Sequence, residues 1–407
     1  MPVVAWYLVT RVVILAVLVV AVVAELLEQE DGGFRIGGDG WFGEVARGTW
    51  DRLNSWDALW MRDIAERGYF GLDDVDGDPG HWRSLAFFPL MPYLMRGVSF
   101  VGFMPAAWAG ALISLVAGVF VAFAAAALAA RMGMGRRSMI LSSVMVTTAP
   151  MAVVMLMPYT EALFLALAGW GLVAVVDKRW GRAGLLILLA GLTRSTAMGL
   201  FIVLAIAVIA GDRRNPRAWL AVAVAPVGWA VYLLWSSARL SDAGGYFGAQ
   251  ARGWNSEVDG GAATLRWLWG SLATSRETGY AISAIMIIVV AATLAWAFVD
   301  WAVARVAAWR GARAGSGEAA SPAFLDRWGA CWPVLLFSCL AVGQVLVSDG
   351  LMHSRPRLFL SGVLVLLVFA PFVARMRAFD RAWILAAWVL GSAWVGAYML
   401  VPFPWAI

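Results

Sequence analysis

The chain has 407 residues, of which 62% are hydrophobic and only 14% are charged, and its formal net charge is +5. Soluble domains usually carry about a quarter charged residues, so the composition excludes an ordinary soluble protein. The arginines stand in short runs between apolar segments, where they indicate membrane topology rather than an affinity for nucleic acid.

Long apolar segments recur along the whole chain and predict an all-α polytopic membrane protein with one domain, residues 1–407. We expect about eleven transmembrane helices. They lie at residues 5–26, 105–130, 138–157, 160–177, 183–194, 196–211, 217–238, 279–306, 328–348, 357–374 and 382–401. The stretch 183–211 admits two interpretations, one long helix or two short helices broken around Thr193, Arg194 and Ser195.

Basic residues cluster in five of the gaps between these spans. The clusters are Arg131, Arg136 and Arg137; Lys178, Arg179 and Arg182; Arg213, Arg214 and Arg217; Arg310, Arg313 and Arg327; and Arg375, Arg377 and Arg381. If 183–211 forms two helices, all five clusters lie on one side, which the positive-inside rule assigns to the cytoplasm. The N-terminus of this plasma-membrane protein is then cytoplasmic, and the first long loop, residues 27–104, faces outward. Residues 309–327 include a Gly-, Ala- and Ser-rich stretch and predict a flexible cytoplasmic loop.

Of the 26 acidic residues, 14 lie between Glu25 and Asp78, and all of these but Glu25 belong to the outward loop 27–104. Within it, residues 55–69 predict an amphipathic helix that lies in the membrane interface. Its apolar arc consists of Trp56, Leu59, Trp60 and Ile64. The acidic run that follows, Asp73 to Asp78, lacks the glycine and the terminal glutamate of a calcium-binding loop, so we expect a solvated loop without a metal ion.

Three carboxylates of the predicted helix differ in their neighbours. Asp63 stands four residues before Arg67, and Glu66 stands four residues after Arg62, so both have a cation within reach for an ion pair. Asp57 has no basic residue three or four positions away, and it lies on the apolar side. Asp57 therefore either caps the helix or is a carboxylate that the chemistry uses as a general base.

Other polar residues begin or interrupt spans on the same side of the membrane. Glu161 starts one span, where it either serves the site or complements the helix dipole. Arg194 stands inside a hydrophobic stretch, where an arginine either marks a functional site or extends its side chain to the interface.

Six motifs occur in order between about residue 50 and residue 360. They are W-D-x-x-W-x-x-x-I-A-x-x-G-Y (Trp56 to Tyr69), A-F-F-P-L-x-P (Ala86 to Pro92), P-Y-T-E-A-L-F (Pro158 to Phe164), L-T-R-S (Leu192 to Ser195), A-Q-x-x-x-W (Ala249 to Trp254) and H-S-x-P-R (His353 to Arg357). This series resembles the PIG-V type of mannosyltransferase, the GPI mannosyltransferase II family.

The resemblance implies a GT-C class glycosyltransferase that uses a polyprenyl-phosphate sugar and has its active site at the extracytoplasmic membrane face. It also implies that Asp57, in the first-loop motif, is the catalytic base. The Arg- and Ala-rich composition and the short chain depart from the eukaryotic pattern and favour a bacterial, actinobacterial member. That departure leaves the acceptor and the sugar open.

The expected reaction moves mannose, with inversion, from polyprenyl-phosphate mannose to a lipid-linked or cell-envelope glycan acceptor. Asp57 takes the proton of the acceptor hydroxyl, and cations stabilise the leaving phosphate. The candidate phosphate-binding residues are His353, Arg355, Arg357 and Arg194. The candidate sugar- and acceptor-binding residues are Trp56, Trp60, Tyr159, Glu161, Gln250, Trp254 and His81. Because the leaving monophosphate lies beside cationic side chains, we expect no metal ion and no other cofactor.

Three alternatives stay open at this point. One is a transferase of the same class with an arabinofuranosyl or glucosyl donor. Another is a transporter or lipid flippase, which typically shows internal repeats and ionisable groups near the bilayer midplane; this chain has no visible repeat and only Arg194 as such a group. A purely structural membrane scaffold would leave Asp57 without an explanation.

Overall fold

The structure is a computed structural model that describes residues 2–28, 40–75, 77–275, 277–313, 328–403 and 405. Within these ranges the secondary structure is helical apart from two isolated bridges, Val75 with Asp78 and Val258 with Ser348. The expected all-α fold is confirmed for this part of the chain. Of the predicted flexible loop 309–327, residues 314–327 lie outside the described residues.

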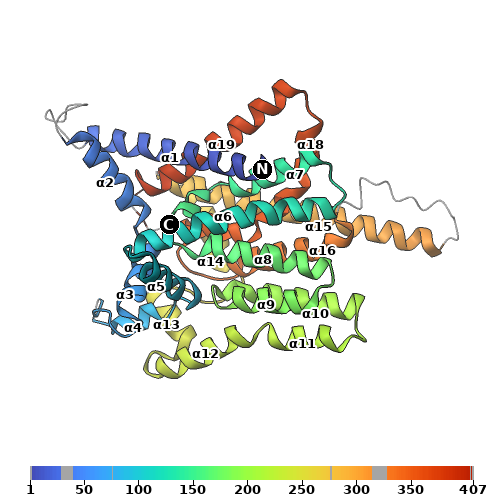
Figure 1. Cartoon of the computed structure of the whole chain (residues 1–407), viewed down its shortest axis with the longest axis horizontal. Coiled ribbons are helices and arrows are strands. Elements are labelled where there is room, and N and C mark those ends of the chain that lie inside the picture. Colours follow the sequence, from blue (N-terminus) through green and yellow to red (C-terminus); the bar gives the residue numbers. More distant parts are fainter. Residues whose placement is uncertain are drawn as a thin grey trace.

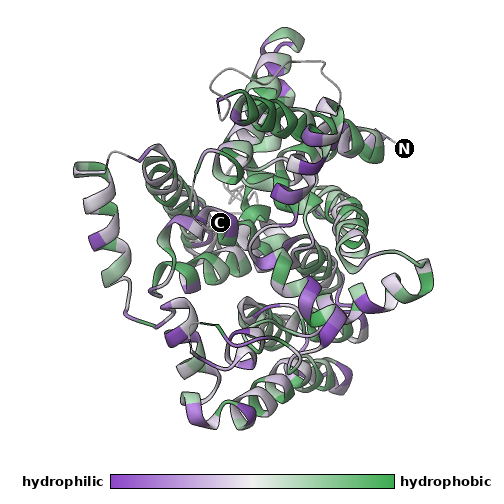
Figure 2. Cartoon of the chain, turned by 90° about the vertical axis from the view of Figure 1, so that its left-hand side faces the viewer, coloured by the Kyte–Doolittle hydropathy of each residue, from purple (hydrophilic) through white to green (hydrophobic). Residues whose placement is uncertain are grey.

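One long helix leads into four shorter ones at the start of the chain. They are α1 (Pro2–Glu28), α2 (Trp41–Leu53), α3 (Asp57–Arg67), α4 (Gly80–Ser84) and α5 (Leu90–Gly102). In Figure 1, α2 to α5 gather at the left-hand end of the molecule, where α13 (Gly245–Trp254) packs against α4. Figure 2 looks onto this end and shows hydrophilic residues among the ends of largely hydrophobic helices.

The middle of the chain forms the body of the bundle. Its elements are α6 (Ala106–Arg131), α7 (Arg136–Thr147), η1 (Ala152–Leu156), α8 (Thr160–Val176), α9 (Trp180–Gly191), η2 (Ser195–Ala197), α10 (Met198–Gly211), α11 (Pro216–Val224) and α12 (Val227–Arg239). Helix α6 packs against α5, α7 and α8. Its inward face consists mostly of alanine, glycine and serine, which lets the neighbouring backbones approach closely.

The last part of the chain completes the bundle. Its elements are η3 (Ser241–Ala243), α14 (Ala262–Ala273), α15 (Thr278–Arg313), η4 (Gly329–Cys331), α16 (Trp332–Leu346), η5 (Met352–Ser354), α17 (Arg355–Leu358), η6 (Phe359–Phe369), α18 (Ala370–Arg375) and α19 (Ala378–Leu400). Helix α19 returns along α1, so the two ends of the chain contribute adjacent helices.

Seven helical segments of the described chain are long and apolar enough to cross a membrane. They are Pro2–Glu28, Ala106–Arg131, Pro216–Arg239, Thr278–Ala307, Gly329–Leu346, Met352–Arg375 and Ala378–Leu400. Three further apolar helices are shorter, at Thr160–Val176, Trp180–Gly191 and Ser195–Gly211. These segments support a membrane-embedded protein with several spans.

The stretch 183–211 is broken into two helices, as the charge pattern favours. Helix α9 ends at Gly191, and Arg194 has an extended backbone with φ −155° and ψ 150° before the next helical turn begins at Ser195. The backbone N–H of Leu90 donates to the carbonyl of Leu192 over 2.9 Å, so the first loop closes over the end of α9. The break therefore places Arg194 in the extended segment between two helices.

Helix α3 is shorter than the predicted segment 55–69, since it begins two residues later and ends two residues earlier, at Arg67. Trp56 adopts a positive φ of 59° and precedes the helix, which begins at Asp57. The buried side chains are Ala58, Met61, Ile64 and Ala65, whereas Leu59 is 42% exposed. Of the predicted apolar arc, Ile64 is buried and Trp56 and Trp60 are partly buried, while α3 packs against α5 and α6. Asp57 nevertheless lies on the buried side, four residues before Met61.

An arginine that the sequence did not single out supports the irregular end of α7. Arg11 of α1 is buried, and its guanidinium donates to the carbonyl oxygens of Thr147 and Ala152, the latter over 2.8 Å. Thr147 is the last residue of α7, so its carbonyl has no partner within that helix, and Ala152 is the first residue of η1. Arg11 thus satisfies them and stabilises the kink in the predicted span 138–157.

Candidate active site

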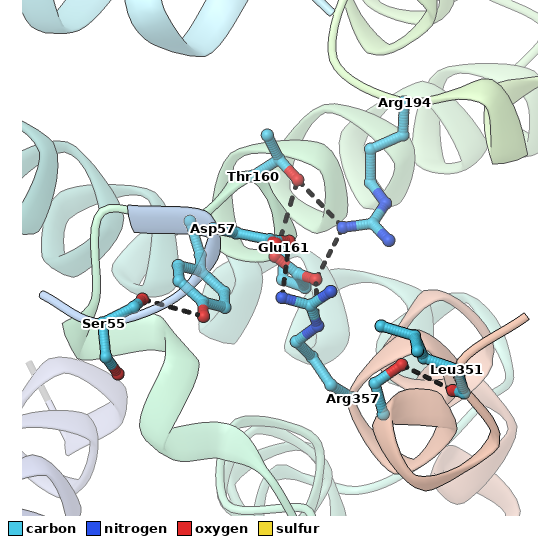
Figure 3. Close-up of polar contacts among 9 residues, drawn as sticks. Ser55, Asp57, Thr160, Glu161, Arg194, Leu351 and Arg357 are labelled. Carbon is cyan, nitrogen blue, oxygen red and sulfur yellow. Dashed lines mark hydrogen bonds and ion pairs between the residues drawn. The ribbon is translucent and has the colours of Figure 1, made fainter. Parts of the chain in front are cut away.

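An aspartate and an arginine from distant parts of the chain meet at the end of the molecule where α2 to α5 gather (Figure 1). Asp57 is the first residue of α3, and Arg357 lies in the short helix α17. The Nη1 of Arg357 donates to the Oδ2 of Asp57 over 2.6 Å, joining residues 300 positions apart (Figure 3). Asp57 therefore does not lack a cation; the helix supplies none, but the fold does. Its side chain also caps no backbone N–H of α3, which excludes the capping alternative.

A second carboxylate lies behind this pair. Glu161 is the second residue of α8 and is 2% exposed. Its Oε1 lies 2.6 Å from the Nη1 of Arg194 and 3.4 Å from the Nε of Arg357. Arg194 also donates to the hydroxyl of Thr160 over 2.9 Å. The site thus contains a linked quartet of two carboxylates and two guanidinium groups, Asp57–Arg357–Glu161–Arg194 (Figure 3).

An aromatic ring supports the centre of this quartet. The guanidinium carbon of Arg357 lies 4.9 Å from the centroid of the Tyr159 ring, a cation–π arrangement. The Tyr159 hydroxyl donates to the backbone carbonyl of Ser55 over 3.2 Å, just before α3. Tyr159 is fully buried. It therefore ties Arg357 to the turn that presents Asp57, and it contacts the cation rather than an open space where a sugar would bind.

The quartet opens onto a cavity of about 680 Å³. Asp57, Arg194 and Arg357 lie on its wall, and the Asp57 side chain keeps 24% of its surface exposed. The remaining wall comes from the loop after α4, from α13, and from the segment between α16 and α17. This volume is ordinary for a pocket that takes a small organic molecule. The carboxylate of Asp57 is thus accessible from the cavity, while Arg194 and Arg357 are largely buried.

Aromatic side chains form another part of the wall. Phe87 and Trp254 line the cavity with their ring centroids 5.7 Å apart, and Trp60 packs against both at 6.1 and 6.4 Å. The buried Nε1 of Trp254 has no hydrogen-bond partner among the described residues. The faces of such rings are apolar surfaces on which a sugar ring can stack.

Gln250 lies beside this aromatic group on α13. Its amide nitrogen donates to the hydroxyl of Tyr246 over 3.1 Å, and both residues line the cavity. Burial raises the pKa of the Tyr246 hydroxyl, so this group stays protonated near neutral pH. Gln250 therefore offers its amide oxygen to the cavity as an acceptor.

A third arginine lies on the wall without a carboxylate partner. Arg355 donates to the hydroxyl of Thr264 over 2.5 Å and to the backbone carbonyl of Ser348. Among the described residues, no carboxylate oxygen lies within 4 Å of it. Ser348 belongs to the bridge with Val258, so two loops meet at this guanidinium. Of the three arginines on the wall, Arg194 and Arg357 are paired with carboxylates, whereas Arg355 has hydrogen bonds to neutral groups.

The helix that carries Thr264 is capped by Asp259. Its carboxylate accepts hydrogen bonds from the backbone N–H groups of Ala263, over 2.5 Å, and of Gly261, over 2.9 Å. These bonds stabilise the ionised form and lower the pKa of Asp259. The cap holds the start of α14 in place and with it the hydroxyl that positions Arg355.

Six of the twelve side chains that the sequence singles out lie on the cavity wall. They are Asp57, Arg194, Gln250, Trp254, Arg355 and Arg357. Glu161, Tyr159 and Trp60 stand directly behind the wall, in contact with residues that line it.

The other three predicted residues lie away from the wall. Trp56 packs against the main hydrophobic core. His353 packs its ring near Tyr280 and Phe403, with centroids 5.9 and 5.6 Å away. His81 lies 5.5 Å from the Phe70 ring. For these three the structure gives no support for a role in binding donor or acceptor.

The sequence did not predict several residues on the wall or directly behind it. Thr160 and Ser348 on the wall and Thr264 behind it supply oxygen atoms that orient the arginines, but a hydroxyl or a carbonyl near a span end carries no signal in sequence spacing. Phe87 and Tyr246 were open to recognition only through their neighbours in the motifs that begin at Ala86 and Ala249.

The described residues contain no group of three or more His, Cys, Asp or Glu side chains that would hold a metal ion. Comparisons of the chain with protein-family models, with curated proteins and with solved structures return no match. The geometry of the site therefore carries the functional argument.

Proposed function

We propose that the protein is a membrane-embedded, inverting glycosyltransferase that moves mannose from polyprenyl-phosphate mannose to a hydroxyl of a lipid-linked or cell-envelope glycan. The observation that carries this proposal is the exposed carboxylate of Asp57 on the wall of a cavity that also presents three guanidinium groups and an aromatic surface. These are the chemical elements that such a transfer requires, brought together from four separate segments of the chain.

Each part of the cavity has a role in the proposed reaction. Asp57 takes the proton of the attacking hydroxyl as its oxygen bonds to the anomeric carbon. The bond from that carbon to the phosphate oxygen breaks, and the arginines stabilise the negative charge that collects on the phosphate. Phe87 and Trp254 offer the surface on which the sugar ring stacks.

Arg355 is the better first contact for the donor phosphate. Arg194 and Arg357 are already paired with carboxylates, so a phosphate that approaches them meets a quartet with no net charge. Arg355 has only neutral hydrogen-bond partners. A charge-assisted hydrogen bond from it to the phosphate stabilises the complex by about 1.5–3 kcal/mol.

The proposal includes the GT-C-like arrangement of eleven spans with the site on the extracytoplasmic face of the plasma membrane. The seven long segments and the three shorter apolar helices would be joined by α7 with η1 to make that number. The N-terminus would be cytoplasmic, because the basic clusters then all lie inside.

Purified protein in lipid nanodiscs, incubated with radiolabelled polyprenyl-phosphate mannose and a membrane lipid extract, tests the function directly. We expect a labelled glycolipid or glycan whose formation depends on the protein. Parallel reactions with arabinofuranosyl and glucosyl donors identify the sugar. If no donor yields a product, and labelled lipid instead crosses the membrane of proteoliposomes, the protein is a flippase and the proposal is wrong.

A further inference from the structure

The shared arginine, Arg357, is the feature that the proposed chemistry leaves unexplained. Its guanidinium contacts both carboxylates of the quartet, at 2.6 Å from Asp57 and 3.4 Å from Glu161. A general base held in such an ion pair has its charge already stabilised, so it takes up a proton reluctantly. Some event must loosen the pair if Asp57 is to act as the base.

The quartet has a net charge of zero while both carboxylates are ionised. When Asp57 takes the hydroxyl proton, the charge of the quartet becomes +1. In the same step the donor phosphate changes from a diester to a monoester and gains one negative charge. The positive charge that appears in the quartet therefore matches the negative charge that appears on the leaving group, and Arg357 stands between the two.

The two carboxylates hold Arg357 unequally. Its buried Nε lies 3.4 Å from the Oε1 of Glu161 without forming an aligned hydrogen bond. The guanidinium therefore depends on Asp57 for its one short hydrogen bond to a carboxylate, at 2.6 Å. A phosphate oxygen in the cavity is an acceptor of the right charge, and the cation–π contact with Tyr159 holds the guanidinium in reach of it.

We infer that Arg357 exchanges partners during the reaction, pairing with Asp57 at rest and with the phosphate of the polyprenyl carrier when Asp57 loses its charge. Glu161, which both arginines contact, keeps Arg357 anchored in either state. The phosphate and Asp57 thus compete for one cation, and the binding of the lipid phosphate is coupled to the state of the base. This inference rests on the proposed function, because it names the phosphate of that donor as the second partner.

The test is a double-mutant cycle on ligand binding, with no sugar transfer involved. The probe is farnesyl monophosphate, and farnesol, which has the same chain without the phosphate, is the control ligand. Affinities are measured for the full-length protein in nanodiscs, for Asp57→Asn, for Arg357→Gln and for the double variant. Asp63→Asn, which changes a carboxylate elsewhere on α3, is the matched control variant.

We expect Asp57→Asn to bind farnesyl monophosphate roughly ten- to a hundredfold more tightly than the unmodified protein, the scale of one charge-assisted hydrogen bond. The gain should vanish in the Arg357→Gln background, because no shared cation is left to release. Farnesol should bind equally to all variants, and Asp63→Asn should bind the phosphate as the unmodified protein does.

Other results overturn the inference in distinguishable ways. If Asp57→Asn tightens the binding of farnesyl monophosphate equally with Arg357 and with Gln at position 357, Asp57 only repels the phosphate. If Asp57→Asn does not tighten binding at all, Asp57 and the phosphate do not compete for Arg357. In both cases the proposed transferase stands. If the unmodified protein and Asp57→Asn bind the phosphate no better than farnesol, the proposed function fails as well. Should Arg357→Gln not fold, Arg357→Met replaces it, because methionine also removes the shared cation; a gain as large as in the original background then counts against the exchange.

Discussion

Asp57→Asn tests whether Asp57 is the general base without changing the size of its side chain. The amide keeps the size of the side chain and still accepts a hydrogen bond from Arg357, but it does not take up the hydroxyl proton. We expect a folded protein whose transfer rate falls by at least about 10²-fold, the usual effect of removing a general base. Turnover of labelled donor in nanodiscs measures it.

Asp63→Asn is the control for this experiment on the same helix. Asp63 pairs with Arg67 at 3.3 Å on an exposed surface, where such pairs contribute little. Near-normal transfer by a well-folded Asp57→Asn protein would exclude Asp57 as the base. Glu161 would not replace it readily, because it is 2% exposed and lies behind the wall.

Glu161→Gln tests the anchoring role of the buried carboxylate. The change removes the negative charge that Arg194 and Arg357 share, which leaves a positive charge in excess among buried groups. Breaking a buried ion pair in this way costs about 3–5 kcal/mol. We expect a marked fall in the midpoint of thermal unfolding, measured by fluorescence-detected size exclusion.

Asp177→Asn provides the comparison for Glu161→Gln. Asp177 pairs with Arg131 at 2.6 Å, but both side chains keep about a quarter of their surface exposed, at 23% and 29%. Its loss should cost less than about 1 kcal/mol. If the two variants lower the midpoint of thermal unfolding equally, burial does not make the ion pairs of the quartet more stabilising than the Asp177–Arg131 pair.

The sequence predicts the individual charged residues of the site better than their pairing. Asp57 is recognisable because helical spacing leaves it without a local cation on the apolar side of α3. Its actual partner comes from a helix 300 residues later, and no local pattern encodes that contact. For the same reason Arg357 and Arg194 were expected to face the donor phosphate alone, whereas each one contacts a carboxylate.

At the level of helices, close packing of α1 on α6 gives a prediction about glycine. A Cβ added at Gly118 would overlap the hydroxyl and the ring of Tyr7, whose hydroxyl donates to the carbonyl of Leu115. We expect Gly118→Ala to lower the free energy of unfolding by about 1–3 kcal/mol through overpacking. Thermal unfolding of the purified protein reports it.

Gly97 in α5 is a glycine at which an added Cβ would have space, unlike at Gly118. It lies in the interior of α5, and a Cβ there would meet no atom within 4 Å. Gly97→Ala should therefore stabilise the protein by about 0.5–1 kcal/mol, because alanine loses less backbone entropy in a helix. If both substitutions change stability in the same direction, helix propensity rather than α1–α6 contact decides the outcome at Gly118.

Hydrophobic pattern and charge predict different features of the helices. Apolar run length predicts the long helices, and the count of basic residues favours the break near Arg194, which the structure has. On α3 the predicted apolar arc contains only one of the four buried side chains, Ile64. The other three, Ala58, Met61 and Ala65, lie outside that arc, and the contact of α3 with α5 and α6 is not encoded in the local pattern.

For the molecule as a whole, the orientation across the membrane is open to a direct test. Single cysteines at the exposed positions Asp74 and Arg137, in a Cys331→Ser/Cys339→Ser background, should react differently with an impermeant thiol reagent. In intact cells we expect labelling at position 74 and none at position 137 until the membrane is opened. The reverse pattern would place the cavity on the cytoplasmic side and contradict the proposed function.

The shortness of three consecutive helices has a consequence for the lipid around them. Helices α8, α9 and α10 have 17, 12 and 14 residues, so they rise about 25, 18 and 21 Å, less than the roughly 30 Å of a bilayer's hydrocarbon core. Hydrophobic mismatch of this kind makes the surrounding bilayer thinner. The leaflet beside Arg194 would then dip, bringing lipid headgroups down to the level of the cavity.

This dip predicts that transfer depends on bilayer thickness. Dimyristoyl lipids already match the short helices, whereas dierucoyl lipids must deform, at a cost of a fraction of a kcal/mol for each ångström of mismatch. We expect transfer in proteoliposomes to fall severalfold from the thin to the thick bilayer, with headgroup and protein density held constant. Unchanged rates would mean that the first loop, which closes over α9 at Leu90 and Leu192, shields the short helices from the lipid.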